Sequence, residues 1–401
     1  MEITDSAVRA HDQREQTGVR IEARRLTQEV DGGRTILRDI SLTVRPGQLV
    51  ALAGASGSGK TTLLEALAGV RPAAQGTVTY DGVDYYADLD SFRSMLGFVP
   101  QDDIIHRELP LRRTLRYAAR LRLPASTTPA AADAAVDEVL RVLDLTSRAE
   151  VPVGRLSGGE RKRASIAVEL LTRPRVFFLD EPTSGLDPAM AADFIRHLRR
   201  IADLGTTVVF TTHNPSDVSP CDQVVFLAQD GRLAFAGAPD DACAHFATRG
   251  IEQIYQRLAD EAGPPKWTQR PPADPPALRG AEVLVRPPVE APMGAVRQWA
   301  LLTRRNVAIL ASNRLTLGIL VGSPVAVLLM IVVLFRPHAF DVPNPSPSAT
   351  AMILFWLAFG GFFFGLTYGL LQVCTEMAIL RRERFVVLRV GSYLMAKLAV
   401  L

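Results

Sequence analysis

The hydrophobic pattern of this chain differs between its first and its last part. Short runs of apolar and β-branched residues, at 48–53, 176–179 and 206–212, are bounded by glycine, proline or charged residues. Runs of this length and composition are typical of strands buried in a parallel sheet. A helical pattern from Thr61 to Gly69 follows the first run closely. These features predict an α/β domain with a mostly parallel core sheet.

Two later stretches are long and contain no charged residue. They run from Leu315 to Phe335 and from Ala351 to Val373. At about 1.5 Å per residue the first reaches about 32 Å, and the hydrocarbon core of a bilayer is about 30 Å thick. We therefore expect two membrane-spanning helices, joined by a short proline-rich loop at 336–348.

Arginine flanks these two stretches. The flanking arginines are Arg304, Arg305, Arg314, Arg381, Arg382, Arg384 and Arg389. The loop between the stretches contains only Arg336. Because the cytoplasmic flanks of membrane helices are enriched in lysine and arginine, both flanks are predicted to be cytoplasmic and the loop external. The α/β domain is then predicted to lie in the cytoplasm.

Three smaller patterns concern the membrane part. Residues 296–302 mix apolar and polar positions, which favours a helix lying along a membrane surface; a soluble helix packed on the α/β domain is the alternative. Gly361, Gly365 and Gly369 share one helix face and permit close approach of another helix, from a second copy or from the same chain. Pro324 predicts a kink in the first span.

Composition argues against some classes of partner and indicates where the domains begin and end. The net charge is +3, charged residues make up 22% of the chain, and no basic stripe is interleaved with aromatics, so nucleic acid is a poor candidate. The three cysteines lack metal-ligand spacing and are predicted to be reduced thiols. We expect a polar arm without a secretory signal (1–18), the α/β domain (19–262), a proline-rich extended linker (263–293) and a partial membrane domain (294–401).

Candidate chemistry begins at the glycine-rich segment Gly54–Thr61, between the first buried run and the helix after it. Its glycines let backbone N–H groups turn around phosphates, and the positive end of the helix faces the same site. Lys60 adds a positive charge, and the Thr61 hydroxyl suits Mg²⁺. The segment alone predicts a site for a nucleotide with magnesium, with an ordinary glycine-rich turn as the alternative.

Further polar residues stand at the ends of other runs. Asp180 and Glu181 follow the second buried run, where one carboxylate can hold Mg²⁺ through water and the other can polarise an attacking water. His213 ends the third run and Gln101 follows an apolar segment; each of these alone is more often structural. The segment Leu156–Glu160 reads Leu-Ser-Gly-Gly-Glu.

Taken together and in this order, these motifs resemble those of ATP-binding cassette (ABC) transporters, over residues 19–250. Residues 157–167 and 178–187 are similar to the G subfamily, in which a nucleotide domain precedes the membrane domain on one chain. The resemblance implies a P-loop NTPase domain with a core parallel sheet, a β subdomain near 19–95 and a helical subdomain near 104–172, followed by an all-α transmembrane domain.

The resemblance also implies a role for each motif. The residues implied to contact ATP are Gly54, Ala55, Ser56, Gly57, Ser58, Gly59, Lys60, Thr61 and Thr62. Those implied to act in hydrolysis are Glu181, His213, Lys60 and Gln101, and those implied to hold Mg²⁺ are Thr61, Gln101 and Asp180. The signature Leu156, Ser157, Gly158, Gly159 and Glu160 would reach ATP held by a partner subunit, and Asp187 would lie at the dimer seam. Gln101 would also sit where the nucleotide domain meets the membrane domain.

Two departures from the family pattern stand out. Val30 occupies the approximate place of an aromatic residue that stacks on adenine in many members, so weaker contact with the base is expected. The family has six spans per subunit, whereas this chain stops at Leu401, soon after the expected cytoplasmic loop helix (376–392) and the start of a third span near 394. The chain is therefore expected to be a fragment.

The function implied is an ATP-hydrolysing export subunit in the cytoplasmic membrane. It would work as a dimer, with a second copy or a related half-transporter, on an unidentified amphipathic or lipid-like small molecule. A soluble cassette ATPase acting on ribosomes or DNA is one alternative. Another is an importer, or a lipid-scrambling or regulatory ATPase tethered to the membrane.

Overall fold

The computed structural model describes residues 18–30, 33–260, 293–334, 347–386 and 388–400. The predicted linker and external loop, and the predicted arm except for Gly18, fall almost entirely outside these residues. The described residues form two compact units. The first draws on 1–103, 137–146 and 156–290, and the second on 104–136, 147–155 and 291–401. Each unit is described by itself.

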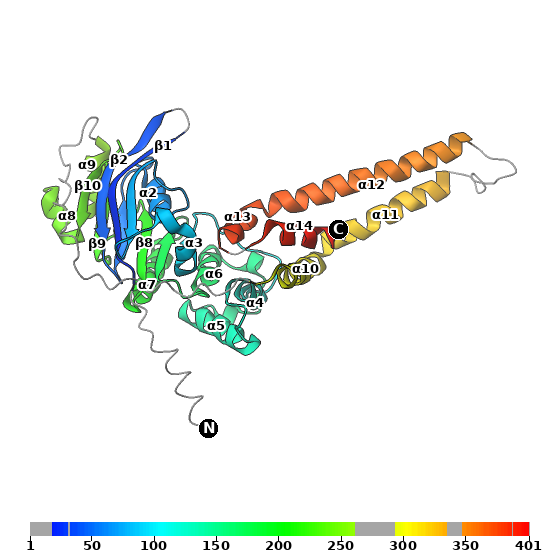
Figure 1. The fold of residues 1–401 in the computed structure, drawn as a ribbon, viewed down its shortest axis with the longest axis horizontal. Helices are drawn as coiled ribbons and strands as arrows, with labels where there is room; N and C mark the ends of the chain where they lie inside the picture. Colours follow the sequence, from blue (N-terminus) through cyan, green and yellow to red (C-terminus); the bar gives the residue numbers. More distant parts are fainter. Residues whose placement is uncertain (1–17, 31–32, 261–292, 335–346, 387, 401) are drawn as a thin grey trace, which may run out of the picture. The chain divides into compact units, whose positions relative to one another are not determined.

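A six-stranded sheet forms the centre of the first unit, with the strand order β10-β9-β3-β8-β7-β6. The strands are β3 (Leu49–Ala53), β6 (Leu96–Val99), β7 (Val176–Leu179), β8 (Thr207–Thr212), β9 (Gln223–Leu227) and β10 (Leu233–Gly237). All pairs are parallel except β9 with β10. Every residue of β3, β7 and β8 is buried. The three predicted strands therefore lie side by side at the centre of this sheet, which confirms the predicted fold class (Figure 1).

A second, antiparallel sheet has the order β2-β1-β4-β5. Its strands are β1 (Ile21–Val30), β2 (Arg34–Val44), β4 (Gln75–Tyr80) and β5 (Val83–Asp84). Ile21 pairs with Val44 on one side and with Tyr80 on the other. The apolar residues of β1 and β4 that face inward belong to one core with those of β3 and β8. This sheet is the predicted β subdomain.

Helix α2 (Lys60–Leu67) follows β3 and packs against β3 and β8. Its last carbonyl groups have no partner inside the helix. Three tyrosine hydroxyls from the β subdomain donate to this end of the chain: Tyr80 to Leu67 O, Tyr85 to Ala68 O, and Tyr86 to Ala66 O. These three hydrogen bonds therefore hold the C-terminal end of α2 in place, and the segment Gly54–Thr61 lies at its other end.

The other helices of the α/β part follow the predicted pattern of a helical insert and surface helices. They are α3 (Leu89–Phe92), α4 (Leu111–Arg122), α5 (Pro129–Val142), α6 (Gly158–Leu170), α7 (Pro188–Asp203), α8 (Pro239–His245) and α9 (Ile251–Asp260). The segment Leu156–Glu160 runs into the start of α6, and α7 packs against β3 and β8. α4 belongs to the second compact unit, and the division between the units passes through α5.

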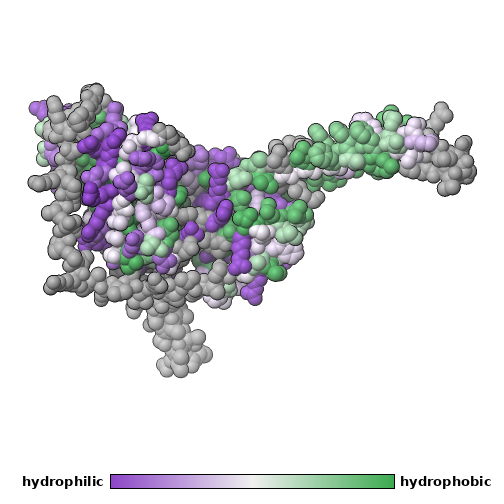
Figure 2. Space-filling model, turned by 45° about the horizontal axis from the view of Figure 1, so that its top comes forward, coloured by the Kyte–Doolittle hydropathy of each residue, from purple (hydrophilic) through white to green (hydrophobic). Residues whose placement is uncertain are grey.

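The described residues of the last part of the chain form five helices. They are α10 (Ala295–Ser312), α11 (Arg314–Leu334), α12 (Pro347–Thr375), α13 (Met377–Val386) and α14 (Val390–Leu398). Among the described residues, Thr316–Leu334 is the one stretch with the length and hydropathy needed to cross a membrane, and none of it is buried. Thr350–Leu366 is a shorter apolar helix. Hydrophobic side chains cover the visible face of α11 and α12 (Figure 2).

The helix predicted at 376–392 is divided in the structure. α13 ends at Val386, and Arg389 has the extended angles φ −87° and ψ 121° before α14 begins at Val390. The Arg389 N–H donates to the Gln298 side-chain oxygen of α10, at 2.9 Å. A contact between helices far apart in sequence thus holds the break, which no local pattern could reveal.

α10 buries polar as well as apolar side chains. Gln298, Arg305 and Asn306 are buried together with Leu302, whereas Val296 and Val307 are 75% and 51% exposed. Exposed apolar side chains of this kind are what a helix at a membrane surface presents to lipid.

Candidate functional site

The segment Gly54–Thr61 forms a tight loop between β3 and α2. Gly54, Gly57 and Gly59 have φ angles of 148°, 81° and 94°, a region that side chains other than glycine rarely enter. A Cβ built on Gly59 would lie 2.9 Å from Leu37 Cδ2, so neither the backbone angle nor the space allows another residue. The glycines of this segment are therefore required by the shape of the loop.

Lys60 and Ser58 point their polar atoms at this loop. The Lys60 ammonium donates to Gly54 O at 2.9 Å and to Ala55 O at 2.8 Å. Burial lowers the pKa of Lys60, and the nearby Glu181 and Asp180 carboxylates oppose that shift. Ser58 Oγ is buried and has no hydrogen-bond partner. An anion with several oxygens would give the Ser58 hydroxyl a partner and would balance the charge of Lys60.

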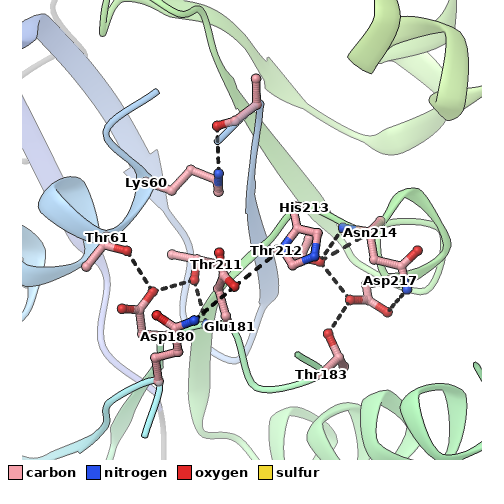
Figure 3. A network of polar contacts seen from close by, with 12 residues as sticks. Lys60, Thr61, Asp180, Glu181, Thr183, Thr211, Thr212, His213, Asn214 and Asp217 are labelled. Atoms are coloured by element: carbon pink, nitrogen blue, oxygen red, sulfur yellow. Dashed lines mark hydrogen bonds and ion pairs between the residues drawn. The ribbon is translucent and has the colours of Figure 1, made fainter. Parts of the chain in front are cut away.

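Asp180 lies at the end of β7, beside α2 (Figure 3). Its Oδ1 accepts hydrogen bonds from Thr61 Oγ1 at 3.0 Å and from Thr211 Oγ1 at 2.7 Å. β7 and β8 are adjacent and parallel, so their carboxyl ends meet at the same edge of the sheet. The predicted Mg²⁺ ligands Thr61 and Asp180 are therefore brought together.

Glu181 is the centre of the second predicted group. Its Oε2 lies 3.4 Å from Gln101 Nε2 and 3.4 Å from His213 Nδ1. Glu181 has a φ of 42°, a strained conformation for a residue with a side chain. Its N–H donates to Thr211 Oγ1 at 2.7 Å, which holds this conformation (Figure 3). The structure thus brings Gln101, Glu181 and His213 together at the edge where Asp180 also lies.

Sequence reasoning did not identify the hydroxyl and carboxylate groups that support this cluster. Asp217 is buried, and its Oδ2 accepts from Thr183 Oγ1 at 2.6 Å and from Thr212 Oγ1 at 2.7 Å. Its Oδ1 accepts from Asn214 Nδ2 at 3.2 Å. These bonds tie the segment after Glu181 to the segment after His213. The one signal in the sequence was the pair of threonines that ends β8.

The segment Leu156–Glu160 builds the start of α6. Ser157 Oγ accepts from the Glu160 N–H, and the Glu160 carboxylate accepts from the Ser157 N–H at 2.9 Å, a reciprocal capping box. Leu156 and Gly159 are buried, whereas Ser157 and Gly158 are exposed. A Cβ built on Gly158 meets nothing within 4 Å. The end of the helix is therefore open, with N–H groups and a hydroxyl at its surface.

Asp187 occupies the start of a different helix, α7. Its Oδ1 accepts from the Met190 N–H at 3.0 Å and caps the helix. A Cβ built on Gly159 would lie 3.3 Å from Met190 Sδ, so the starts of α6 and α7 are close neighbours. Asp187, Ser157 and Gly158 are all exposed. These predicted seam residues share one exposed region, separate from the hydrogen bonds around Glu181.

The chemistry of these groups fits a nucleoside triphosphate with a hard divalent cation. The oxygens of Thr61 and Asp180 suit Mg²⁺, which takes only a few protein ligands and completes its shell with phosphate and water. Among the described residues no group of three or more His, Cys, Asp or Glu side chains could hold a metal alone. A cation bound here would therefore need oxygens from the ligand. Val30 lies half-buried at the end of β1, and residues 31–32 fall outside the described part.

Three comparisons with known proteins bear on this site. Residues 37–184 match the family model described as "ABC transporter". The chain is 37% identical over 393 residues to an ABC transporter ATP-binding/permease protein of Mycobacterium tuberculosis, an alignment covering 95% of this chain and 44% of that protein. It is 39% identical over 240 residues to ABC transporter G family member 22 of Arabidopsis thaliana, covering 58% of this chain and 31% of the relative.

A solved structure shares the fold of the α/β part. It is cbiO1 of Clostridium perfringens, described as part of the ABC transporter complex cbiONQ, at 25% identity and a TM-score of 0.53. The alignment covers 60% of this chain and 96% of that structure. The chain spans less than half the length of the two curated relatives. With the phosphate loop, the paired carboxylates and the Ser157 segment in place, these similarities show that the chain carries an ABC transporter ATPase domain.

Proposed function

We propose that the chain is the ATP-hydrolysing part of a fused export subunit that works as a dimer in the cytoplasmic membrane. The observation that carries this proposal is the position of Glu181, whose Oε2 lies 3.4 Å from both Gln101 and His213 beside the Thr61–Asp180 pair. A carboxylate so placed can orient a water for attack on a terminal phosphate. Similarity to ATP-binding/permease proteins supports coupling to transport.

ATP would be held by the loop between β3 and α2. The backbone N–H groups of 54–62, the Lys60 ammonium and the Ser58 hydroxyl would bind the β- and γ-phosphates. Thr61 and Asp180 would hold Mg²⁺, with Gln101 as a further ligand, and the ion would neutralise charge on the phosphates. Contact with adenine would be weak near Val30.

Hydrolysis would depend on groups that are already oriented. Glu181 would align and polarise the attacking water, and His213 would contact the γ-phosphate. The Thr211 hydroxyl bonds to both Asp180 Oδ1 and the Glu181 N–H, so it keeps the metal-binding and water-binding carboxylates in fixed relation. Preorganisation of this kind is the main protein contribution to phosphoryl transfer.

The second copy would complete the site. Ser157 and Gly158 expose the N-terminal end of α6, whose N–H groups and partial positive charge favour a phosphate. We infer that this end binds the γ-phosphate of ATP held by the partner, with Asp187 at the seam. The exposed start of α7 beside α6 supports such a contact.

Helices α11 and α12 would span the membrane, and α10 would lie at its cytoplasmic surface. The arginine pattern supports a cytoplasmic position for the ATPase domain. One of the flanking arginines does not contribute to this pattern. Arg305 is buried and paired with Glu383 instead of facing lipid headgroups. The remaining flanking arginines still outnumber Arg336. Cargo of amphipathic or lipid-like character is proposed on the resemblance to the G subfamily.

Substitution of Glu181 tests the shared site. Glu181→Gln should bind ATP but hydrolyse it at least about 100-fold more slowly, and should accumulate as an ATP-bound dimer in light scattering. Lys60→Ala should abolish both ATP binding and dimer formation. A Glu181→Gln chain that stays monomeric at saturating ATP and Mg²⁺ would refute the shared site, and wild-type turnover by Lys60→Ala would refute the phosphate site.

Transport needs its own measurement. The chain should remain in membranes after a carbonate wash, and vesicles with outward-facing ATPase domains should accumulate a fluorescent lipid analogue only with ATP. Retention in the membrane with ATP turnover but no movement of any amphipathic probe would favour a tethered regulatory ATPase. Release by carbonate would favour the soluble alternative.

A further inference from the structure

Lys162 is a buried lysine on the helix that begins at the signature. It lies four residues after Gly158, so the two share one face of α6, one turn apart. Its residue exposure is 4%, although a lysine is rarely buried without a partner. No part of the ATP site described above uses this charge, and the sequence motifs do not assign it a role.

The Lys162 ammonium binds the segment that contains Gln101. Nζ donates to Gln101 O at 2.5 Å and lies 3.9 Å from Asp103 Oδ1. Burial lowers the pKa of Lys162, and the Asp103 and Asp102 carboxylates oppose that shift. A buried ammonium is stable only while such partners stay in place, so α6 and the 101–103 segment are held at a fixed separation.

The same segment reaches the hydrolytic carboxylate. Gln101 Nε2 lies 3.4 Å from Glu181 Oε2, and His213 Nδ1 lies 3.4 Å from the same oxygen. A polar path therefore runs from the exposed end of α6, through Lys162 and Gln101, to Glu181. All of these residues belong to the first compact unit. This path connects Ser157, which would bind the partner's ATP, with Glu181, which would act on the ATP bound by the same chain.

We propose that Lys162 couples the two ATP sites of the dimer. When Ser157 engages the partner's nucleotide, the resulting shift of α6 is carried by Lys162 to Gln101 and sets the position of Glu181 on the chain's own site. Lys162 is thus a positioning residue that makes hydrolysis cooperative. This inference rests on the proposed dimer, because only there does the signature touch the other nucleotide.

The test compares ATPase kinetics of the full chain reconstituted in lipid vesicles. Wild type should show a Hill coefficient for ATP well above 1. Lys162→Met keeps the length and burial of the side chain but removes its donor; it should bring the Hill coefficient close to 1 and lower kcat about 10-fold, within the range of typical coupling between sites. Half-saturating ATP should change less than about threefold, because the phosphate loop is untouched.

Three further variants separate coupling from simple structural loss. Lys162→Arg keeps a donor and should restore most of the cooperativity. Asp103→Asn removes the ion pair but not the bond to Gln101 O, and should give an intermediate Hill coefficient. Arg196→Met removes an exposed surface pair with Asp193 on α7 and should behave like wild type. ATP binding and thermal melting are measured for each.

The outcomes are distinct. Wild-type kcat and Hill coefficient in a folded Lys162→Met chain would overturn the inference and leave the proposed function standing. If Lys162→Met fails to bind ATP or to fold, the Hill coefficient of Asp103→Asn is used instead. A wild-type Hill coefficient in that variant overturns the inference. A wild-type chain that is itself non-cooperative and never dimerises with ATP would refute the proposed function and the inference with it.

Discussion

Threonine hydroxyls hold Asp180 and Glu181, the two acidic residues proposed for the ATP site, in position. Thr211 bonds to Asp180 and to the Glu181 N–H, while Thr212 bonds to Asp217. Neutral hydroxyls can satisfy a carboxylate without cancelling its charge, so the acids remain available for a cation and a water. At this scale the site is organised by groups that carry no charge themselves.

Removing the Thr211 hydroxyl should therefore affect catalysis more than binding. Thr211→Val keeps the shape of the strand but deletes two hydrogen bonds at the site, and we expect kcat to fall about 10- to 100-fold with little change in ATP affinity. Steady-state ATPase assays measure the change. Thr207→Val, at the other end of β8, deletes hydrogen bonds with Val19 and Gly47 and is the control; equal kcat losses in both variants would contradict the idea.

Because His106 is buried, we expect the stability of the second unit to fall in acid. Burial lowers its pKa to about 3, and Arg305 and Lys397 add to the shift while Glu383 opposes it. The folded pKa is thus below the unfolded value of about 6.5, so the stability tied to neutral His106 is present above that value and is lost as pH falls toward 3. Between pH 7.5 and 5, wild type should lose several degrees of Tm.

His106→Leu should lose less Tm over the same interval, because no imidazole has to be kept neutral. Glu383 also has a lowered pKa: burial alone would raise it, but the charge and hydrogen bonds of Arg305, together with the charges of His106 and Arg122, outweigh burial. Its contribution is lost only as pH falls below about 4.5, outside the interval measured. A His106→Leu chain with the same pH dependence as wild type would assign the acid sensitivity to other groups.

At the scale of elements, the polar face of α10 explains how the last helices are held together. Arg305 forms two hydrogen bonds with the Glu383 carboxylate of α13, and both side chains are nearly inaccessible. Leu302 of α10 and Tyr393 of α14 pack in one small core with Leu121 of α4. The ion pair therefore sits inside a packed group of helices, where an unpaired charge is costly.

Breaking this pair should destabilise the second unit strongly. Arg305→Met removes the hydrogen-bonded partner of the buried Glu383 carboxylate, which costs about 3–5 kcal/mol. The double variant Arg305→Met/Glu383→Leu should recover much of that loss, because neither charge remains. Unfolding in detergent by denaturant measures both. Arg297→Met, on the exposed side of α10, should stay within about 0.5 kcal/mol of wild type; a double variant as unstable as the single one would refute the pairing argument.

The sequence predicted the strands and loops of the ATP site well because each is a local feature. The run before Gly54 and the run before Asp180 are apolar on both faces, and glycine can be recognised where φ is positive. Gln101 and His213 could be joined to Glu181 only through family resemblance, since residues far apart in sequence meet there. The break before α14 and the role of Asp217 depend on contacts with no local signal.

At the scale of the molecule, the glycine face of α12 is directed away from its neighbour in the chain. A Cβ built on Gly360 would lie 3.8 Å from Val327 of α11, whereas one built on Gly361 or Gly365 would meet nothing within 4 Å. Same-chain packing in the described residues thus uses Gly360. The Gly361 and Gly365 face is open among the described residues, so a helix of a second copy or a further helix of the same subunit could pack there.

Filling that face should weaken assembly. Gly365→Leu places a large side chain where close helix approach is proposed, and we expect the dimer fraction in detergent to fall several-fold at a given concentration. Crosslinking or single-molecule photobleaching measures it. Val332→Leu, on the exposed surface of α11, is the matched control. Unchanged dimerisation of Gly365→Leu would remove this face from the interface.

The interleaving of the two compact units has a consequence for biogenesis. The second unit contains residues 104–136 and 147–155 together with residues from 291 onward. A ribosome therefore releases α4 long before the helices that bury Leu121 have been made. The two compact units therefore cannot fold one after the other in the order of synthesis. If the last helices insert into a membrane as proposed, α4 must stay shielded until they have been made, and a delay in insertion should expose the nascent ATPase half to aggregation and proteolysis.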